Sequence, residues 1–275
     1  ACCHGFMAHP SAISTIAPWG ATQTNYSFEF ENINFVSPAY SYNLTVSAIF
    51  AKKVTAKNLL GDYLALYLNY HAFDLDIDNI VGVYRDDLLE AGRNVVKNLI
   101  HFEPELRGKP NVAFGDWCVS RASVLRKSTM TEWWAFKAHL FDTGHTFKNI
   151  EFSKIAGSIE LYAASARTSL VEYLKLSDSQ NEIVLGPMNY TTVELVDFTL
   201  KSVALTLYML DSTKVGTLKC NNFIVNRPLA IIQSPAFEVD LFDAKDVTIS
   251  IDYGLLRNTS KIKDIKLKGV AVNSY

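Results

Sequence analysis

Strict alternation of apolar and polar residues over most of the chain constrains the fold more than any other feature. In residues 26–35, YSFEFENINF, polar residues separate the phenylalanines and isoleucine, and the pattern recurs in 61–78 and 191–211. Successive side chains of a strand point to opposite faces, so this pattern is typical of strands with one buried and one solvated face. Turn signals recur roughly every 10–15 residues. We therefore expect a mostly β fold, an antiparallel β-sandwich of the jelly-roll type.

Two segments depart from this alternation. Residues 85–100, RDDLLEAGRNVVKNLI, carry an apolar stripe at helical spacing behind two aspartates that suit a helix start, and they predict the one principal helix. Residues 1–20 are rich in Ala, Ser, His and Pro and have no period, so they predict an extended N-terminal arm. The expected organisation is an arm over 1–20 and a β-sandwich domain over 21–275.

The composition narrows the classes of partner. The formal net charge is −2 and the pI about 6.3, so no basic excess favours nucleic acid as a ligand. No apolar run reaches the roughly 18 residues of a membrane helix. The start, ACCHGFMAHP, lacks the basic and apolar regions of a signal peptide. N-glycosylation sequons at Asn25, Asn43, Asn189 and Asn258 leave a secreted or cell-surface location open.

The segment HAFDLDIDN, residues 71–79, is the sharpest candidate site because it places aspartates at alternate positions. Asp74, Asp76 and Asp78 match the first acidic positions of a calcium loop, but Arg85 stands where Ca²⁺ needs a bidentate Glu. A pair of catalytic carboxylates is a further alternative. On a strand all three carboxylates share one face, which explains the pattern without a ligand. We interpret the segment as the polar face of a strand, with a weak metal alternative.

Other catalytic and metal-binding patterns are fainter. Cys118, between Trp117 and Val119, is expected to be a buried, inert thiol rather than a nucleophile. The remaining candidates lack a complete ligand set: His139, Asp142 and His145 in one cluster, and Cys2, Cys3 and His4 in another. No Gly-rich phosphate loop occurs. We therefore expect no enzyme activity, no cofactor and no metal.

Exposed aromatic and apolar residues suggest where partners bind. Trp133 and Trp134 are adjacent, so on a strand one of them faces away from the core toward a partner, ligand or second layer. In the arm, Phe6, Met7 and Trp19 could be buried against a neighbouring subunit. These residues are our interface or ligand candidates.

The function expected from these observations is structural. A β-sandwich with an extended arm, near-neutral charge and no catalytic constellation is typical of a subunit of a closed shell or filament, built from copies of itself or related subunits. We expect a viral coat protein of jelly-roll type, located in the virion, by analogy of fold alone. The alternative is a secreted or surface-exposed module that binds glycan or lipid through Trp133 or Trp134.

Overall fold

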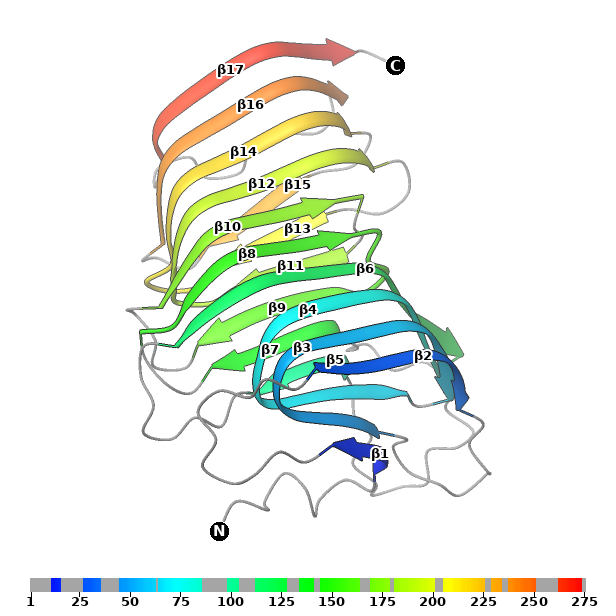
Figure 1. Cartoon of the computed structure of the whole chain (residues 1–275). Coiled ribbons are helices and arrows are strands. Elements are labelled where there is room, and N and C mark those ends of the chain that lie inside the picture. The colour runs from blue at the N-terminus through cyan, green and yellow to red at the C-terminus, as the bar shows by residue number, and fades with distance from the viewer. Residues whose placement is uncertain are drawn as a thin grey trace.

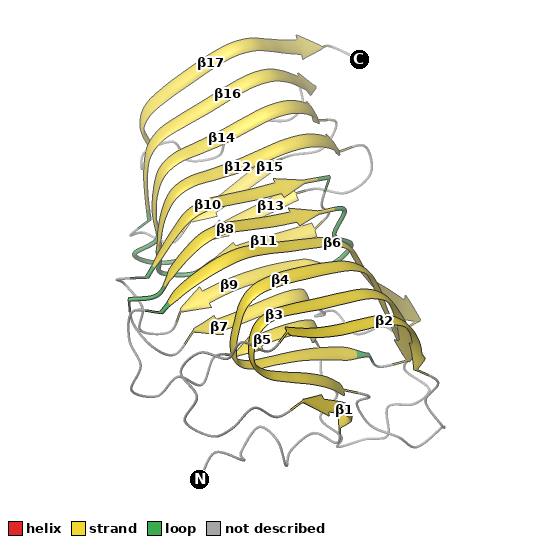
Figure 2. Cartoon of the chain, viewed as in Figure 1, coloured by secondary structure: helices red, strands yellow, loops and turns green. Residues whose placement is uncertain are grey.

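Figure 2 shows that the regular elements of the described part of the chain are strands. The computed structural model describes residues 11–15, 27–35, 45–62, 64–85, 98–103, 112–127, 134–140, 144–163, 169–178, 181–200, 205–225, 229–233, 237–250 and 262–273. Within these ranges no residue lies in a helix, and so no described helix is long and apolar enough to cross a membrane.

Two sets of strands make up the fold. The first set is β2 (Ser27–Phe35), β3 (Thr45–Asp62), β4 (Ala65–Arg85), β6 (Ala113–Lys127), β8 (Thr146–Ser153), β10 (Leu170–Ser177), β12 (Asn189–Leu200), β14 (Lys214–Val225), β16 (Glu238–Ser250) and β17 (Ile262–Asn273). The second set is β1 (Ser11–Thr15), β5 (Asn98–Glu103), β7 (Trp134–Leu140), β9 (Ser158–Ala163), β11 (Asn181–Leu185), β13 (Leu205–Met209) and β15 (Leu229–Gln233).

Strands pair in parallel with the equivalent strand of the next circuit of the chain. The first sheet runs in the order β2-β3-β4-β6-β8-β10-β12-β14-β16-β17. The second runs β5-β7-β9-β11-β13-β15. The long strands β3 and β4 take part in both sheets, since β3 also pairs with β1 and β4 with β5. The chain is thus a parallel β-solenoid, a stack of circuits that we call rungs, which rises from β1 and β2 to β17 (Figure 1).

The first-set strands bend at one residue with positive φ in each rung. Glu31 pairs with Lys57 and Ile33 with Leu59, so Asn32 lies directly beside Asn58, and the same register continues from rung to rung. Positive φ is uncommon outside glycine and is tolerated best by Asn and Asp, whose short polar side chains can bond locally. The column consists of Asn32, Asn58, Asn79, Arg121, Lys154, Asp178, Asp197, Asn222, Asp246 and Gly269, with φ between 43° and 65°.

The core lies inside the rungs. Two inward positions of every first-set strand form two continuous core columns that run along the stack. In β6, for example, these positions hold Trp117 and Val119, and the Trp117 ring lies 4.4 Å from the ring of Phe102 in β5, across the interior. From β3 to β16 the columns are at most 2% exposed, and they contain Val54, Leu75, Trp117, Ile150, Leu174, Val193, Leu218 and Phe242 in one and Ala56, Ile77, Val119, Phe152, Leu176, Leu195, Cys220 and Ala244 in the other.

The expected antiparallel β-sandwich of jelly-roll type is wrong. The strands are parallel, although their alternation and mostly β content agree with the prediction. Alternation reports only that one face of a strand is buried, and a solenoid produces it as well, because its sheets wrap around their own core and leave the outer face to water. The pattern therefore identified strands correctly but could not decide which strands are neighbours.

The expected helix over 85–100 is also not found in the described chain. Arg85 ends β4 and Asn98 begins β5, so both ends of the segment are strand residues, and residues 86–97 lie outside the described ranges. Within the expected arm, β1 pairs in parallel with β3 of the same chain, at Ser11 with Thr45. The other residues of 1–20 lie outside the described ranges, so the arm and the domain boundary after residue 20 stay predictions.

Candidate functional site: the outer face and the open end

The aspartates of HAFDLDIDN lie on the outer face of β4. Leu75 and Ile77 point into the core and are 2% and 1% exposed, whereas Asp74, Asp76 and Asp78 on the other face are partly exposed. The interpretation of the segment as the polar face of a strand is confirmed. The contacts that the three carboxylates make with neighbouring rungs show whether they are available to bind a ligand.

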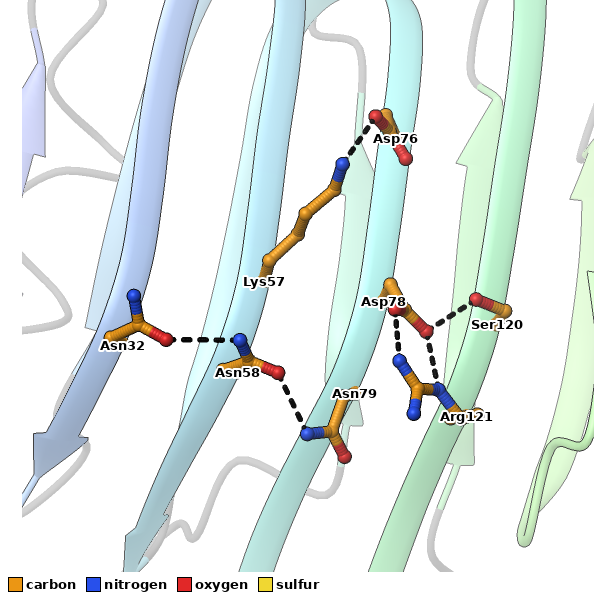
Figure 3. A network of polar contacts seen from close by, with 8 residues as sticks. All are labelled: Asn32, Lys57, Asn58, Asp76, Asp78, Asn79, Ser120 and Arg121. Atoms are coloured by element: carbon orange, nitrogen blue, oxygen red, sulfur yellow. Dashed lines mark hydrogen bonds and ion pairs between the residues drawn. The ribbon is translucent and has the colours of Figure 1, made fainter.

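Asp74 and Asp76 are both engaged by neighbouring strands. Asp74 accepts a hydrogen bond through Oδ1 from the backbone N–H of Asp116 at 2.9 Å. Asp76 Oδ2 lies 3.0 Å from Nζ of Lys57 and 3.7 Å from Nζ of Lys53, both on β3 (Figure 3 shows the first of these pairs). The hydrogen bond with Asp76 raises the pKa of Lys57. These contacts tie β4 to the strands on both sides.

Asp78 is held by a fork of donors from β6 (Figure 3). Arg121 donates through Nε to Asp78 Oδ1 at 2.7 Å and through Nη2 to Oδ2, and Ser120 Oγ donates to Oδ1 at 2.6 Å. Bidentate Arg–carboxylate pairs are among the stronger polar contacts of proteins. The hydrogen bond from Arg121 is the main cause that lowers the pKa of Asp78 to about 2.

Asparagines of the positive-φ column form a ladder beside these ion pairs. The amide of Asn79 donates to Oδ1 of Asn58 at 2.8 Å, and the amide of Asn58 donates to Oδ1 of Asn32 at 2.9 Å, as Figure 3 shows. Farther along the stack, Asn222 donates to Asp197 in the same way at 2.7 Å. The outer face near the bend is therefore a polar network that links one rung to the next.

The described residues contain no group of three or more His, Cys, Asp and Glu placed to hold a metal ion. In the cluster of His139, Asp142 and His145, the His145 side chain is fully buried and burial lowers its pKa. Its Nδ1 accepts a hydrogen bond from the backbone N–H of Val112 at 3.3 Å. His139 lies in β7, and Asp142 falls outside the described residues.

Cys118 differs from its expected burial. It is exposed on the outer face of β6, while its neighbours Trp117 and Val119 point into the core. Partial burial and the nearby carboxylate of Glu151 raise the pKa of the Cys118 thiol, which keeps it protonated and weakens it as a nucleophile. Alternation explains the error, because a residue between two core residues of a strand must face outward. Among the described residues, Cys220 is the free thiol that is buried.

Most of the aromatic and apolar interface candidates lie outside the described residues. This holds for Phe6, Met7, Trp19 and Trp133. Trp134 is the first residue of β7 in the second sheet. Their roles in an interface or in ligand binding stay predictions.

The C-terminal rung is a candidate site that sequence reasoning missed. Ile265 and Leu267 of β17 continue the two core columns, but they are 47% and 57% exposed, whereas Phe242 and Ala244 directly beneath them are fully buried. Val272 on the same strand is 62% exposed. Among the described strands β17 pairs with β16 alone, so no other described strand bonds the backbone N–H and C=O groups of its second edge.

Lysines flank this open edge. Lys266 Nζ lies 3.6 Å from Asp243 Oδ2 on β16, and Lys263 is paired with Asp240. Lys268 occupies the next outer position of β17 and is exposed. A shallow depression spans the outer face of β14, β16 and β17, and it is lined by Lys219, Asn221, Asp243, Lys245, Lys266 and Lys268.

The class defined by this architecture is a parallel β-solenoid with a polar outer face and an apolar, unpaired C-terminal edge. Comparison with known protein families, with curated proteins and with solved structures finds no match for this chain.

Proposed function

We propose that this protein is a non-enzymatic assembly subunit that associates through the open end of its solenoid, formed by β17. The observation that carries the proposal is the interruption of the core columns at that strand. Positions that are at most 2% exposed from β3 to β16 become 47% exposed at Ile265 and 57% at Leu267. These are core residues by their place in the fold, and they lack the layer that covers every core residue of the preceding rungs.

Both polar and apolar groups at β17 favour a strand as the partner. An exposed sheet edge is a template for another chain, because its free N–H and C=O groups can extend the ladder. Full burial of a Leu or Ile side chain contributes about 1.5–3 kcal/mol, so covering the exposed half of each contributes about 1 kcal/mol before the cost of association. A strand laid along β17 would satisfy the backbone groups and cover both side chains.

The assembly role that we expect from the sequence is kept in this proposal, but the more specific expectation of a viral coat protein is not. The coat class and the virion location rest on analogy with a jelly roll, and the strands are parallel instead. An elongated stack with an open end suits a linear assembly, which is the filament alternative of that expectation.

Light scattering after size exclusion, with electron microscopy of the same fractions, tests this function. We expect the full chain to associate with rising concentration and Leu267→Lys to weaken association by at least about tenfold, because a charge in the contact must be desolvated. Leu125→Lys is the matched control, since Leu125 is 52% exposed but lies on an internal rung. A full chain that stays monomeric, or a Leu267→Lys variant that assembles like the parent, would refute the proposal.

A further inference from the structure

We infer that the strand laid along β17 is β2 of a second copy, so that copies join head to tail in the register that rungs keep within one chain. This inference rests on the proposed assembly role and names its partner. The observation behind it is that β2 and β17, the two terminal strands of the described first sheet, match. They match in their core residues, in the charge of their outer residues and in the position of the bend.

The core positions of the two terminal strands correspond. Following the register from rung to rung, Phe28 occupies the column of Ile265 and Phe30 the column of Leu267. Continued stacking would therefore set Phe28 on Ile265 and Phe30 on Leu267. Phe30 is only 6% exposed, so most of the apolar surface covered by the contact belongs to β17.

The outer positions are complementary in charge. In the same register Glu29 of one copy faces Lys266 of the other, and Glu31 faces Lys268. All four side chains are exposed in the single chain. Ion pairs of this kind also join neighbouring rungs within the chain. For example, Lys266 Nζ lies 3.6 Å from Asp243 Oδ2 in the rung below it. Two acidic residues at one end and two basic residues at the other thus meet column by column.

The bend of the sheet also matches at the two ends. Asn32 is the positive-φ residue of β2, with φ 55°, and Gly269 is that of β17, with φ 65°. Both sit one position beyond the outer pair described above, so two stacked copies would bend at the same place. The positive-φ column would then run from one copy into the next without a step.

The free edges have the polarity that head-to-tail joining needs. Among the described strands β2 pairs with β3 alone, as β17 pairs with β16 alone, so these two strands lie at opposite ends of the described first sheet. Joining these edges gives a parallel pair, like every pairing in the described chain. A two-fold contact between two β17 strands would instead be antiparallel and would gather Lys263, Lys266 and Lys268 of both copies at one edge, where like charges repel.

Charge reversal in the full chain tests the inference. One variant is Glu29→Lys/Glu31→Lys, with basic residues at both ends, and the other is Lys266→Glu/Lys268→Glu, with acidic residues at both ends. We expect each variant alone to associate at least about tenfold more weakly than the parent, because like charges meet across every contact. An equal mixture should recover assembly as an alternating copolymer, since each basic end now meets an acidic one.

The control and a second measurement separate the possible outcomes. Lys219→Glu/Lys245→Glu makes the same change in the same two columns, on internal rungs, and should assemble like the parent. Raising salt from about 0.05 to about 0.5 M should weaken assembly of the parent and strengthen that of each single variant, because the charges are screened. If circular dichroism shows that one variant folds poorly, the salt response of the parent and of the other variant still tests whether opposite charges meet at the contact.

Failure of this inference differs from failure of the proposed function. If Leu267→Lys blocks assembly while Glu29→Lys/Glu31→Lys assembles like the parent and mixing restores nothing, β17 is an interface but β2 is not its partner. A closed dimer as the largest species would also overturn the head-to-tail contact, because such a contact leaves a free end on every assembly and does not close. If Leu267→Lys has no effect, the assembly role itself fails.

Discussion

At the residue scale, the fold depends on one backbone conformation that recurs once in, or directly after, each strand of the first set. Asn, Asp and Gly adopt positive φ at most of these positions, but Arg121 and Lys154 do so with φ 49° and 53°. Side chains without a short polar group pay about 1–2 kcal/mol for this conformation. Arg121 adopts this conformation while it makes the bidentate bond to Asp78, so the positive-φ position and the ion pair belong to one local arrangement.

Substitutions at Asn58 should separate two contributions to stability, that of the positive-φ backbone and that of the side-chain hydrogen bonds. Asn58 has φ 55° and bonds both Asn32 and Asn79. We expect Asn58→Val to destabilise by about 2–3 kcal/mol, because a β-branched residue is strained at positive φ. Asn58→Gly should cost less than about 1 kcal/mol, since glycine accepts this φ and only exposed hydrogen bonds are lost. Urea unfolding measures the difference, and equal losses for Val and Gly would contradict the backbone argument.

A pH dependence follows from the ion pair of Asp78. Its pKa in the folded chain is about 2, below the ordinary value of 3.8, so folding favours the ionised form. The resulting stability is fully present above pH 3.8 and is lost as the pH falls through about 2. We expect Asp78→Asn to melt below the parent at pH 7, and the difference in melting temperature to shrink between about pH 4 and pH 2. Arg121→Gln should show the same trend, and a difference that stays constant below pH 4 would contradict it.

At the element scale, the sequence predicts strands well and their pairing poorly. The segment 26–35 was expected as a strand and is β2, and the aspartates of β4 face outward as predicted. Strand pairing depends on which segments lie side by side, and alternation is silent on that. The spacing of equivalent residues hides the repeat, because it is 21 between Asn58 and Asn79 but 42 between Asp74 and Asp116.

The candidate site could not have been found from local pattern alone. Ile265 and Leu267 alternate with Asp264, Lys266 and Lys268 as in any half-buried strand. Their exposure results from the place of β17 at the end of the stack, which is a property of the whole fold. One sequence signal was available for the bends: Asn, Asp or Gly between two alternating runs, as at Asn32 and Gly269. Arg121 and Lys154 interrupt it.

At the scale of the whole molecule, the described strand pairings of the first sheet join only adjacent rungs. β6, for example, pairs with β4 and β8, and β14 with β12 and β16. The stability of such a stack is approximately a sum over rungs and the contacts between neighbours. A local loss of packing should therefore remain local, and two-state unfolding is not expected.

Removal of a core ring near the open end tests this independence of rungs. Phe242 is fully buried in β16, and Phe242→Ala should cost about 3–5 kcal/mol in the rungs that contact it. We expect faster amide hydrogen exchange in β14, β16 and β17 and unchanged exchange in β4, β6 and β8. Hydrogen exchange with mass spectrometry measures both groups at once. Uniform loss of protection along the chain would show a single cooperative unit instead.

The open edge of β17 also bears on how the chain folds during synthesis. Rungs emerge from the ribosome in order, N-terminal first, and each can form on the one already in place. Before β16 is made, β14 is the last strand of the first sheet, and Leu218 and Cys220 then lack the strand that covers them in this structure, as Ile265 and Leu267 do on β17. Every intermediate of this growth thus presents one template strand to the next segment of nascent chain.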